Sequence, residues 1–126
     1  MTAALRECVL VVDDQALIAD LWCCLLEDMG FEVCGTAPTA AAAIAMAEKH
    51  RPRVIIMDVR LRGELDGVDA ALAIHESLDS KVIFITGSRE PETMARIQRD
   101  RPTTVLFKPV SSRQFQSAVR DAFHPQ

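Results

Sequence analysis

Short runs of apolar residues recur along the chain at intervals that suit a sheet of buried strands. The clearest runs cover residues 8–12, 54–57, 81–85 and 104–107, and a weaker run covers residues 31–35. Their length and their β-branched residues are typical of strands, and apolar residues at successive positions indicate that both faces of the sheet are covered. The pattern therefore predicts five strands in a parallel sheet with helices on both sides.

Helical periodicity appears in the two segments that separate the runs at residues 8–12, 31–35 and 54–57. Leu17, Leu21 and Leu25 recur at every fourth position, and Gly30 stands where a C-terminal cap belongs. Thr39 can cap a second helix of strong helix formers, which ends before Pro52 because proline cannot continue it.

Three more helices are predicted in the second half of the chain. Residues 68–78 form one pattern, and residues 91–100 form another that starts with a proline. Ser111 or Ser112 can cap the last helix. The residues of this helix that we expect to point inward are Phe115, Val119 and Phe123. Five strands alternating with five helices predict, with right-handed crossovers, an open doubly wound α/β sheet.

The chain has 126 residues, of which 49% are hydrophobic and 25% charged, and this balance is typical of a globular protein. Its length suits a single domain, which we expect over residues 1–126 with a folded core over about residues 7–123. The net charge is -4 and no basic stripe is interleaved with aromatic residues, which argues against nucleic acid as a direct partner.

The N-terminus has no apolar run typical of a secretion signal, and no segment is long and apolar enough to cross a membrane. The four cysteines lack the C-x-x-C spacing of a zinc or redox site, so we interpret them as reduced packing residues. These features predict a cytoplasmic protein without membrane insertion. The cysteines are Cys8, Cys23, Cys24 and Cys34.

Polar residues follow four of the predicted strands directly. The first strand ends in Asp13 and Asp14, the third in Asp58, the fourth in Thr86 and the fifth in Lys108. In a doubly wound sheet, ligands bind beyond the carboxyl ends of the strands, near the point where the strand order reverses. We therefore expect three carboxylates, a hydroxyl and an ammonium to share one edge of the sheet.

Each of these residues has a simpler interpretation when it is taken alone. Asp14 could cap the first helix, Thr86 could be a turn residue, and Asp58 and Lys108 could be solvated charges. Several carboxylates in one place repel one another, however, unless a hard cation such as Mg²⁺ joins them. A carboxylate can also act as a nucleophile toward a phosphoryl group, whose charge a metal and a fixed cation then neutralise. The joint placement favours this second interpretation.

The segments VVDDQ, VIIMDVRL, DGVDAALAI, VIFITG and LFKPV resemble, in this order and spacing, the response-regulator receiver domain, the phospho-accepting module of two-component signalling. The resemblance covers essentially the whole chain. It implies a flavodoxin-like, five-stranded parallel sheet in the order 2-1-3-4-5 with five helices.

The resemblance also implies a role for each site residue. Asp58 matches the phosphorylated aspartate, and Asp13 and Asp14 match the acidic pair that holds Mg²⁺. The backbone carbonyl of Arg60 matches the remaining protein ligand of the metal, which Asp58 also binds. Thr86 matches the switch hydroxyl.

Lys108 matches the lysine that contacts the phosphoryl group, and its peptide bond to Pro109 is cis in the family.

Two residues and one loop depart from the family pattern. Val105 replaces an aromatic residue that couples to the switch hydroxyl, so the ordinary coupling is in doubt. The loop over residues 58–67 lacks the usual proline and is one residue longer, which we interpret as a tolerated insertion. Arg60 places a long cation beside the phosphorylation site, where we expect it to be solvated and modulatory.

The resemblance implies a stand-alone receiver, not an enzyme with its own substrate. A histidine kinase or a phosphotransfer protein would phosphorylate Asp58. The surface of the fourth helix, fifth strand and fifth helix would then change its affinity for a downstream effector or for a second copy of the chain. The alternative is a phosphorylation-independent interaction module with a receiver fold, which Val105 and the altered loop motivate.

Two further classes of protein do not fit. A phosphatase of the haloacid-dehalogenase type needs a second acid two positions after its nucleophile, where Arg60 stands. A dinucleotide-binding protein needs a glycine-rich turn where Asp13 and Asp14 stand. We assign no catalytic role to His50, His75 or His124, and we interpret residues 96–101 as a solvated helix face.

Overall fold

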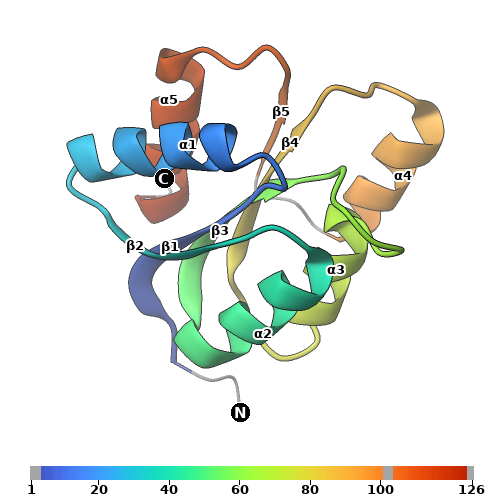
Figure 1. Cartoon of the computed structure of the whole chain (residues 1–126), viewed down its shortest axis with the longest axis horizontal. Helices are drawn as coiled ribbons and strands as arrows, with labels where there is room; N and C mark the ends of the chain where they lie inside the picture. The colour runs from blue at the N-terminus through green and yellow to red at the C-terminus, as the bar shows by residue number, and fades with distance from the viewer. Residues whose placement is uncertain (1–3, 101–103, 125–126) are drawn as a thin grey trace.

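The computed structural model describes residues 4–100 and 104–124, and over these residues five strands alternate with five helices (Figure 1). The strands are β1 (Arg6–Val12), β2 (Glu32–Ala37), β3 (Pro52–Asp58), β4 (Lys81–Thr86) and β5 (Thr104–Phe107). The helices are α1 (Ala16–Asp28), α2 (Ala40–His50), α3 (Gly67–Ile74), α4 (Pro91–Arg99) and α5 (Ser112–Phe123).

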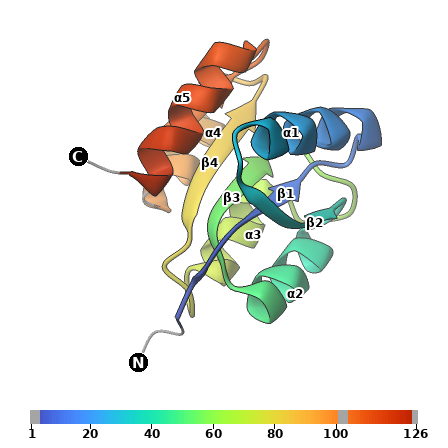
Figure 2. The ribbon, with the colours of Figure 1, turned by 90° about the vertical axis from the view of Figure 1, so that its left-hand side faces the viewer.

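The strands form one parallel sheet in the order β2-β1-β3-β4-β5, as predicted. Helices α1 and α5 cover one face of this sheet, and α2 and α3 cover the other (Figures 1 and 2). The chain starts in β1, moves outward to β2, and then crosses to β3 on the other side of β1. The strand order therefore reverses beside β1, which places the ends of β1 and β3 next to each other.

Each face of the sheet carries its own apolar layer. Val9 and Val11 of β1 are fully buried on the face that α1 and α5 cover, whereas Leu10 and Val12 are buried on the face that α2 and α3 cover. Strand side chains alternate between the two faces, so a strand buried on both must be apolar at every position. This explains the uninterrupted apolar runs in the sequence.

Several predicted boundaries were wrong, and β1 and β3 each begin two residues earlier than predicted, at Arg6 and Pro52. The second strand covers Glu32–Ala37 and extends two residues beyond the predicted end, with an irregular register against β1 between Val9 and Leu10. Helix α3 ends at Ile74, four residues before the predicted end, and residues 75–77 form a turn. The amide of Leu78 still donates to the carbonyl of Ile74 at 3.0 Å, so the helical hydrogen-bond pattern outlasts the helix itself.

The leucine repeat predicted α1 correctly but did not predict its buried face. Leu17 is 83% exposed and Leu21 is 48% exposed. The residues that α1 buries are Ala19, Trp22 and Leu26, and the Trp22 ring stacks on Phe115 of α5 with the centroids 4.5 Å apart. The outer side of α1 therefore presents apolar side chains to solvent.

The expected helix caps are present on α2 and α5. The hydroxyl of Thr39 accepts a hydrogen bond from the amide of Ala42 at 3.1 Å, and the hydroxyl of Ser111 accepts one from the amide of Gln114 at 3.1 Å. Both caps satisfy amides that have no partner within the helix. Among the helices of the described residues, none is long and apolar enough to cross a membrane.

All four cysteines are free, and they differ in exposure. Cys8 is buried, whereas Cys24 is exposed on α1. Burial raises the pKa of Cys34 to about 12, and its thiol donates a hydrogen bond to the carbonyl of Val9 at 3.4 Å. Burial, followed by the nearby acids Glu27 and Asp20, also raises the pKa of Cys23.

Candidate functional site

Three carboxylates meet at the carboxyl edge of the sheet. Asp13 and Asp14 follow β1 directly, and Asp58 ends β3. Each offers an oxygen, and these oxygens all lie within 4.8 Å of one another. The strand order brings the residues together, because β1 and β3 are hydrogen-bonded neighbours with Val12 paired to Met57.

A cation and a hydroxyl complete the same edge. The ammonium of Lys108 lies 3.3 Å from Oδ1 of Asp58. Thr86 ends β4, and its backbone carbonyl accepts a hydrogen bond from the Lys108 amide at 2.9 Å. The Lys108–Pro109 peptide bond is cis, as the resemblance implied. The structure thus brings together the five side chains that the sequence placed at the strand ends.

The two neighbouring acids after β1 have different surroundings. Asp13 is 5% exposed, and Oδ1 of this residue accepts a hydrogen bond from the amide of Gln15 at 2.9 Å. Asp14 is half-buried, and within residues 4–100 and 104–124 no hydrogen bond is assigned to its side chain. The N-cap residue of α1 is Gln15, without a side-chain cap. The alternative in which Asp14 caps α1 is therefore wrong.

Burial makes the carboxylates costly to ionise. Burial raises the pKa of Asp58 to about 6, because the nearby Lys108 ammonium only partly offsets it and Asp13 raises the value further. Burial also raises the pKa of Asp13, against the hydrogen bond from Gln15 and the charge of Lys108. One ammonium is thus not enough to balance this cluster, and a second positive charge would stabilise the ionised state.

The donor set fits a hard divalent cation. Asp13, Asp14 and Asp58 offer carboxylate oxygens, which Mg²⁺ prefers, and no nitrogen or sulfur ligand is needed. Arg60, whose carbonyl the resemblance assigned to the metal, follows β3 by two residues and lines the same pocket as Asp58. Side chains that could hold Mg²⁺ are thus in place.

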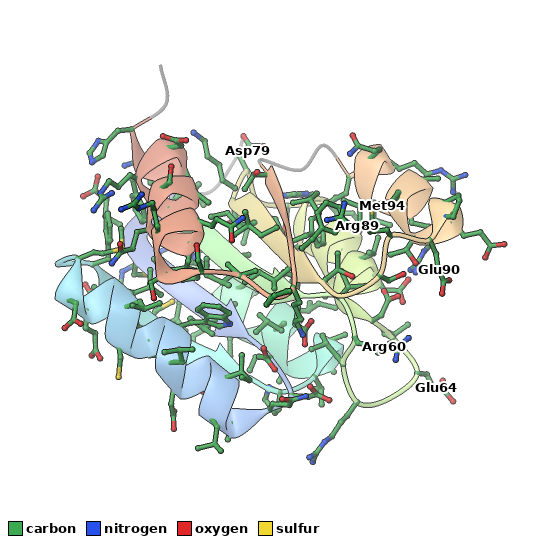
Figure 3. The ribbon with its side chains drawn as sticks, turned by 90° about the horizontal axis from the view of Figure 1, so that it is seen from above. Arg60, Glu64, Asp79, Arg89, Glu90 and Met94 are labelled. Carbon is green, nitrogen blue, oxygen red and sulfur yellow. The ribbon has the colours of Figure 1, made fainter. Side chains whose placement is uncertain are left out.

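A pocket of about 620 Å³ opens beside Asp58, between the β3–α3 loop (residues 59–66) and the β4–α4 loop (residues 87–90). Asp58, Thr86 and Lys108 line its floor, and Arg60 and Arg89 come from the two loops. Arg60 is exposed. Figure 3 shows Arg60 on one loop and Arg89 on the other. The pocket therefore has room and positive charge for a group bonded to Asp58.

The Thr86 hydroxyl holds the β4–α4 loop in its present position. The side chain is buried, and its oxygen accepts a hydrogen bond from the amide of Ser88 at 3.0 Å. The next residue, Arg89, places its guanidinium 3.8 Å from the centre of the Phe107 ring on β5. A change in the direction of the Thr86 hydroxyl would thus alter the loop that leads into α4.

The site depends on a glycine to which sequence reasoning assigned no role. A Cβ atom on Gly67 would lie 2.1 Å from the carbonyl oxygen of Asp58, and the Gly67 amide donates to the carbonyl of Val59 at 2.7 Å. Only a residue without a side chain allows this close approach. The sequence offered a signal, since a glycine stands directly before the helix that was predicted over residues 68–78, and the structure shows that Asp66 caps this helix.

The long β3–α3 loop forms one wall of this pocket. Arg60 and Asp66 line the pocket from this loop, and Arg62 forms an isolated bridge with Thr39 at the start of α2. Gly63 adopts a positive φ of 98°. The loop therefore shapes the edge of the site.

The fold and the acidic cluster together define a receiver module of the two-component type. Residues 9–120 match the family model described as "Response regulator receiver domain". This chain therefore belongs to the response regulator receiver domain family.

Two longer regulatory proteins are similar to this chain over part of their length. It is 31% identical over 109 residues to the transcriptional regulatory protein PdtaR of Mycobacterium tuberculosis, covering 86% of this chain and 53% of PdtaR. It is 30% identical over 115 residues to the phyllosphere-induced regulator PhyR of Methylorubrum extorquens, covering 90% of this chain and 42% of PhyR. The chain thus spans about half the length of these relatives.

The fold also matches a solved receiver structure closely. The signal receiver domain of a modulated diguanylate cyclase from Desulfovibrio desulfuricans G20 superposes with a TM-score of 0.85 at 34% identity, covering 92% of each chain. The likeness extends over nearly all of both chains, so the order of strands and helices is that of a receiver domain.

Proposed function

We propose that this receiver domain accepts a phosphoryl group on Asp58, with Mg²⁺ held by Asp13, Asp14, Asp58 and the backbone carbonyl of Arg60. One observation carries the proposal: a buried carboxylate lies within 4.8 Å of two others and 3.3 Å from the Lys108 ammonium. A structural role for Asp58 would not require this concentration of charge. Phosphoryl transfer to a carboxylate does require it.

The chemistry follows from this arrangement. A carboxylate oxygen of Asp58 attacks phosphorus in line, the new P–O bond forms, and the bond from phosphorus to the histidine nitrogen of the donor breaks. The nitrogen keeps the electron pair. Lys108 meets the negative charge of the phosphoryl oxygens from one side. Mg²⁺, when it is bound by the acids, supplies positive charge to the same oxygens.

The added charge would act on Thr86. A phosphoryl group on Asp58 offers acceptor oxygens beside the Thr86 hydroxyl, which now accepts a hydrogen bond from Ser88. If the Thr86 side chain rotates to bring its hydroxyl to the phosphoryl group, the oxygen leaves the Ser88 amide, and the loop before α4 loses this contact and changes position. We therefore place the output surface on α4, β5 and α5.

The outer side of α1 is suited to docking of the phosphoryl donor. Leu17 is 83% exposed and stands four residues after Asp13, and Leu21 lies one turn further along. Exposed apolar side chains beside a reactive group favour a contact with a partner protein. We propose that a histidine kinase or a phosphotransfer protein contacts these leucines while its phosphohistidine reaches Asp58.

We propose that the output passes to a downstream effector protein or to a second copy of the chain. The relatives PdtaR and PhyR are named as regulators, and in both the region similar to this chain is about half of the protein. These names agree with a regulatory output, and the proposal requires no reaction at this site beyond transfer and loss of the phosphoryl group.

The test is phosphorylation by acetyl phosphate in the presence of Mg²⁺, followed by intact-mass measurement. We expect a mass increase of one phosphoryl group in the wild-type protein, and none in the Asp58→Asn variant or after chelation of Mg²⁺. The matched control is Asp20→Asn, which changes an exposed acid on α1. A wild-type protein that folds but acquires no adduct would overturn the proposal.

The alternative, a phosphorylation-independent interaction module, is favoured by one observation. Val105 is half-buried and packs against the core on the face that α2 and α3 cover. A short branched side chain in this position cannot rotate between a buried and an exposed state as an aromatic ring can. If partner binding is the same with and without beryllofluoride, which mimics a phosphoryl group, this alternative is supported.

A further inference from the structure

Helix α4 is attached to the domain by very little apolar contact. Ile97 is the only fully buried residue within it, and Met94 is half-buried against the same core (Figure 3). A helix usually owes its position to a wide apolar stripe. The position of α4 must therefore depend strongly on polar contacts, and those of the described residues lead to both ends of α3.

The first contact joins the middle of α4 to the start of α3. Arg96 donates to both carboxylate oxygens of Asp66, at 2.6 and 3.0 Å, and to Asp69 at 3.1 Å. Although burial acts in the opposite direction, the hydrogen bonds from Arg96 and Asp69 keep the pKa of Asp66 below its ordinary value. This ion pair is partly exposed, because the side chains of Arg96 and Asp66 are 37% and 29% accessible.

The second contact joins the end of α4 to the end of α3, and it is buried. Nδ1 of His75, the C-cap residue of α3, lies 2.7 Å from Oδ1 of Asp100, the C-cap residue of α4. Nε2 of His75 lies 2.6 Å from the carbonyl oxygen of Ser80. The Ser80 hydroxyl donates to the carbonyl of Pro52 at 2.6 Å. The His75 and Asp100 side chains are only 12% and 2% exposed.

The number of protons in this cluster follows from its geometry. The carbonyl of Ser80 can only accept, so Nε2 of His75 must carry a proton. An ionised Asp100 can also only accept, so Nδ1 must carry a second proton unless the carboxyl group carries it. The two contacts of His75, with Ser80 and with Asp100, thus together require one proton more than a neutral imidazole and an ionised carboxylate contain.

Loss of this extra proton would break one of the two contacts of the ring, because either Nδ1 would face Oδ1 of Asp100 as a second acceptor at 2.7 Å, or Nε2 would face the Ser80 carbonyl in the same way at 2.6 Å. In both cases the imidazole becomes neutral, and the carboxylate of Asp100 loses its opposite charge. Oδ2 of Asp100 is buried and has no hydrogen-bond partner among the residues that the structure describes, so the carboxylate has little other stabilisation there. An unpaired charge in such a place is unfavourable, and the end of α4 would move to hydrate it.

We propose that the buried His75–Asp100 pair is a proton-dependent latch that fixes the C-terminal end of α4 to α3. The latch lies at the edge of the sheet opposite Asp58, because Ser80 precedes β4 whereas Thr86 ends it. It acts on the same helix that the β4–α4 loop leads into. The latch does not depend on phosphorylation of Asp58, so it gives the output surface a second, independent control.

The charged groups near the latch that the structure describes are exposed or only half-buried, so solvent screens them. Asp79 lies in the loop between α3 and β4 (Figure 3). The described charged residues that stand near the members of the cluster in the sequence are Arg51, Arg53, Glu76, Asp79, Lys81, Arg96 and Arg99. The latch is therefore expected to respond chiefly to its own proton.

The experiment measures two quantities separately in the unphosphorylated protein, which are the protonation of the His75 ring and the docking of α4. Nitrogen-15 spectra of the imidazole rings report how many protons His75 carries at each pH, with His50 and His124 as internal references. Amide hydrogen exchange of residues 94–100, corrected for the intrinsic effect of pH and compared with α5, reports docking of α4. We expect loss of the second ring proton and a roughly tenfold or greater rise in exchange of α4 to share one midpoint.

A matched variant makes the test specific. In Asp100→Asn the amide nitrogen can donate to Nδ1 of a neutral His75, so the contact survives without the extra proton. Exchange of α4 should then stay slow and independent of pH. In Asp100→Ala it should be fast at every pH. If α4 of the wild-type protein exchanges at the same corrected rate across the titration of His75, or if Asp100→Asn retains the wild-type dependence, the proposal is wrong.

Discussion

The ammonium of Lys108 lies 3.3 Å from Oδ1 of Asp58, although the two residues are fifty positions apart in the chain. The contact exists because β5 and β3 both end at the same edge of the sheet, with only β4 between them. It is the one ion pair in the described residues that involves a side chain of the proposed acidic site. This pair is thus the most direct place to test the proposed chemistry.

Removal of the Lys108 charge should slow phosphorylation more than it affects folding. We expect Lys108→Ala to reduce the rate of adduct formation with acetyl phosphate by roughly 100-fold, because a fixed cation no longer meets the charge of the phosphoryl oxygens. Lys49→Ala, on the exposed side of α2, is the control and should retain the wild-type rate. Equal rates in wild type and Lys108→Ala would show that the contact has no part in the transfer.

Ionisation of Asp58 should destabilise the metal-free fold. Its pKa is raised to about 6 from an ordinary value of 3.8, so the folded protein holds this proton more tightly than the unfolded chain does. The associated stability is fully present below about pH 4 and is lost as the pH rises through about 6, to a total of about 3 kcal/mol. Urea unfolding in a chelating buffer at pH 4.5 and pH 8 measures the loss.

The Asp58→Asn variant supplies the comparison. Because an amide does not ionise, this variant should be about 3 kcal/mol more stable than the wild-type protein at pH 8 without metal, and the difference should shrink at pH 4.5. Mg²⁺ should stabilise the wild-type protein at pH 8 and have less effect on the variant. Asp20→Asn should match the wild-type protein in all of these conditions. A constant difference between wild type and Asp58→Asn at both pH values would contradict the assigned shift.

A methyl group on Gly67 should distort the phosphorylation site. The new Cβ would lie 2.1 Å from the backbone oxygen of Asp58, so we expect Gly67→Ala to destabilise the domain by about 1–3 kcal/mol and to lower the rate of phosphorylation. Gly87→Ala is a matched control, because nothing lies within 4 Å of its Cβ position. Thermal unfolding of both variants separates the two cases, and a fully stable Gly67→Ala would refute the packing argument.

The exposed leucines of α1 should matter only when the donor is a protein. We expect Leu17→Ala to slow transfer from a phosphorylated histidine phosphotransfer domain by about tenfold and to leave the rate with acetyl phosphate unchanged. Leu72→Ala, which removes an exposed leucine from α3, controls for the loss of apolar surface. If both donors are affected equally, Leu17 supports the site itself and the docking assignment is incorrect.

The sequence predicted the strands well because a strand that is buried on both faces has apolar residues at successive positions. It also located the acidic cluster, since the rule that parallel strands share one carboxyl edge needs only the strand ends. The family resemblance, not the residue pattern, supplied the cis bond before Pro109 and the strand order. Periodicity failed at α1, where Leu17 and Leu21 recur regularly but face solvent.

The contacts that sequence reasoning missed are those between the side chains of packed helices. His75 and Asp100 are 25 positions apart, and neither has a neighbour in the sequence that marks it as paired. Residues 96–101 were interpreted as a solvated face, but Ile97 and Asp100 are buried and Arg96 forms an ion pair with α3; Arg101 lies outside the described residues. Such pairs depend on how two helices pack, which no local pattern records.

The unequal exposure of the cysteines has a practical consequence. Cys24 presents its thiol to solvent on the outer side of α1, whereas Cys8 is buried, and burial raises the pKa of Cys23 and Cys34. A maleimide dye reacts with thiolates that it can reach, so at neutral pH it should modify Cys24 first. The natural sequence thus provides a fluorescent labelling position on the helix proposed to meet the phosphoryl donor, and binding of that donor could be followed by polarisation without introducing a new cysteine.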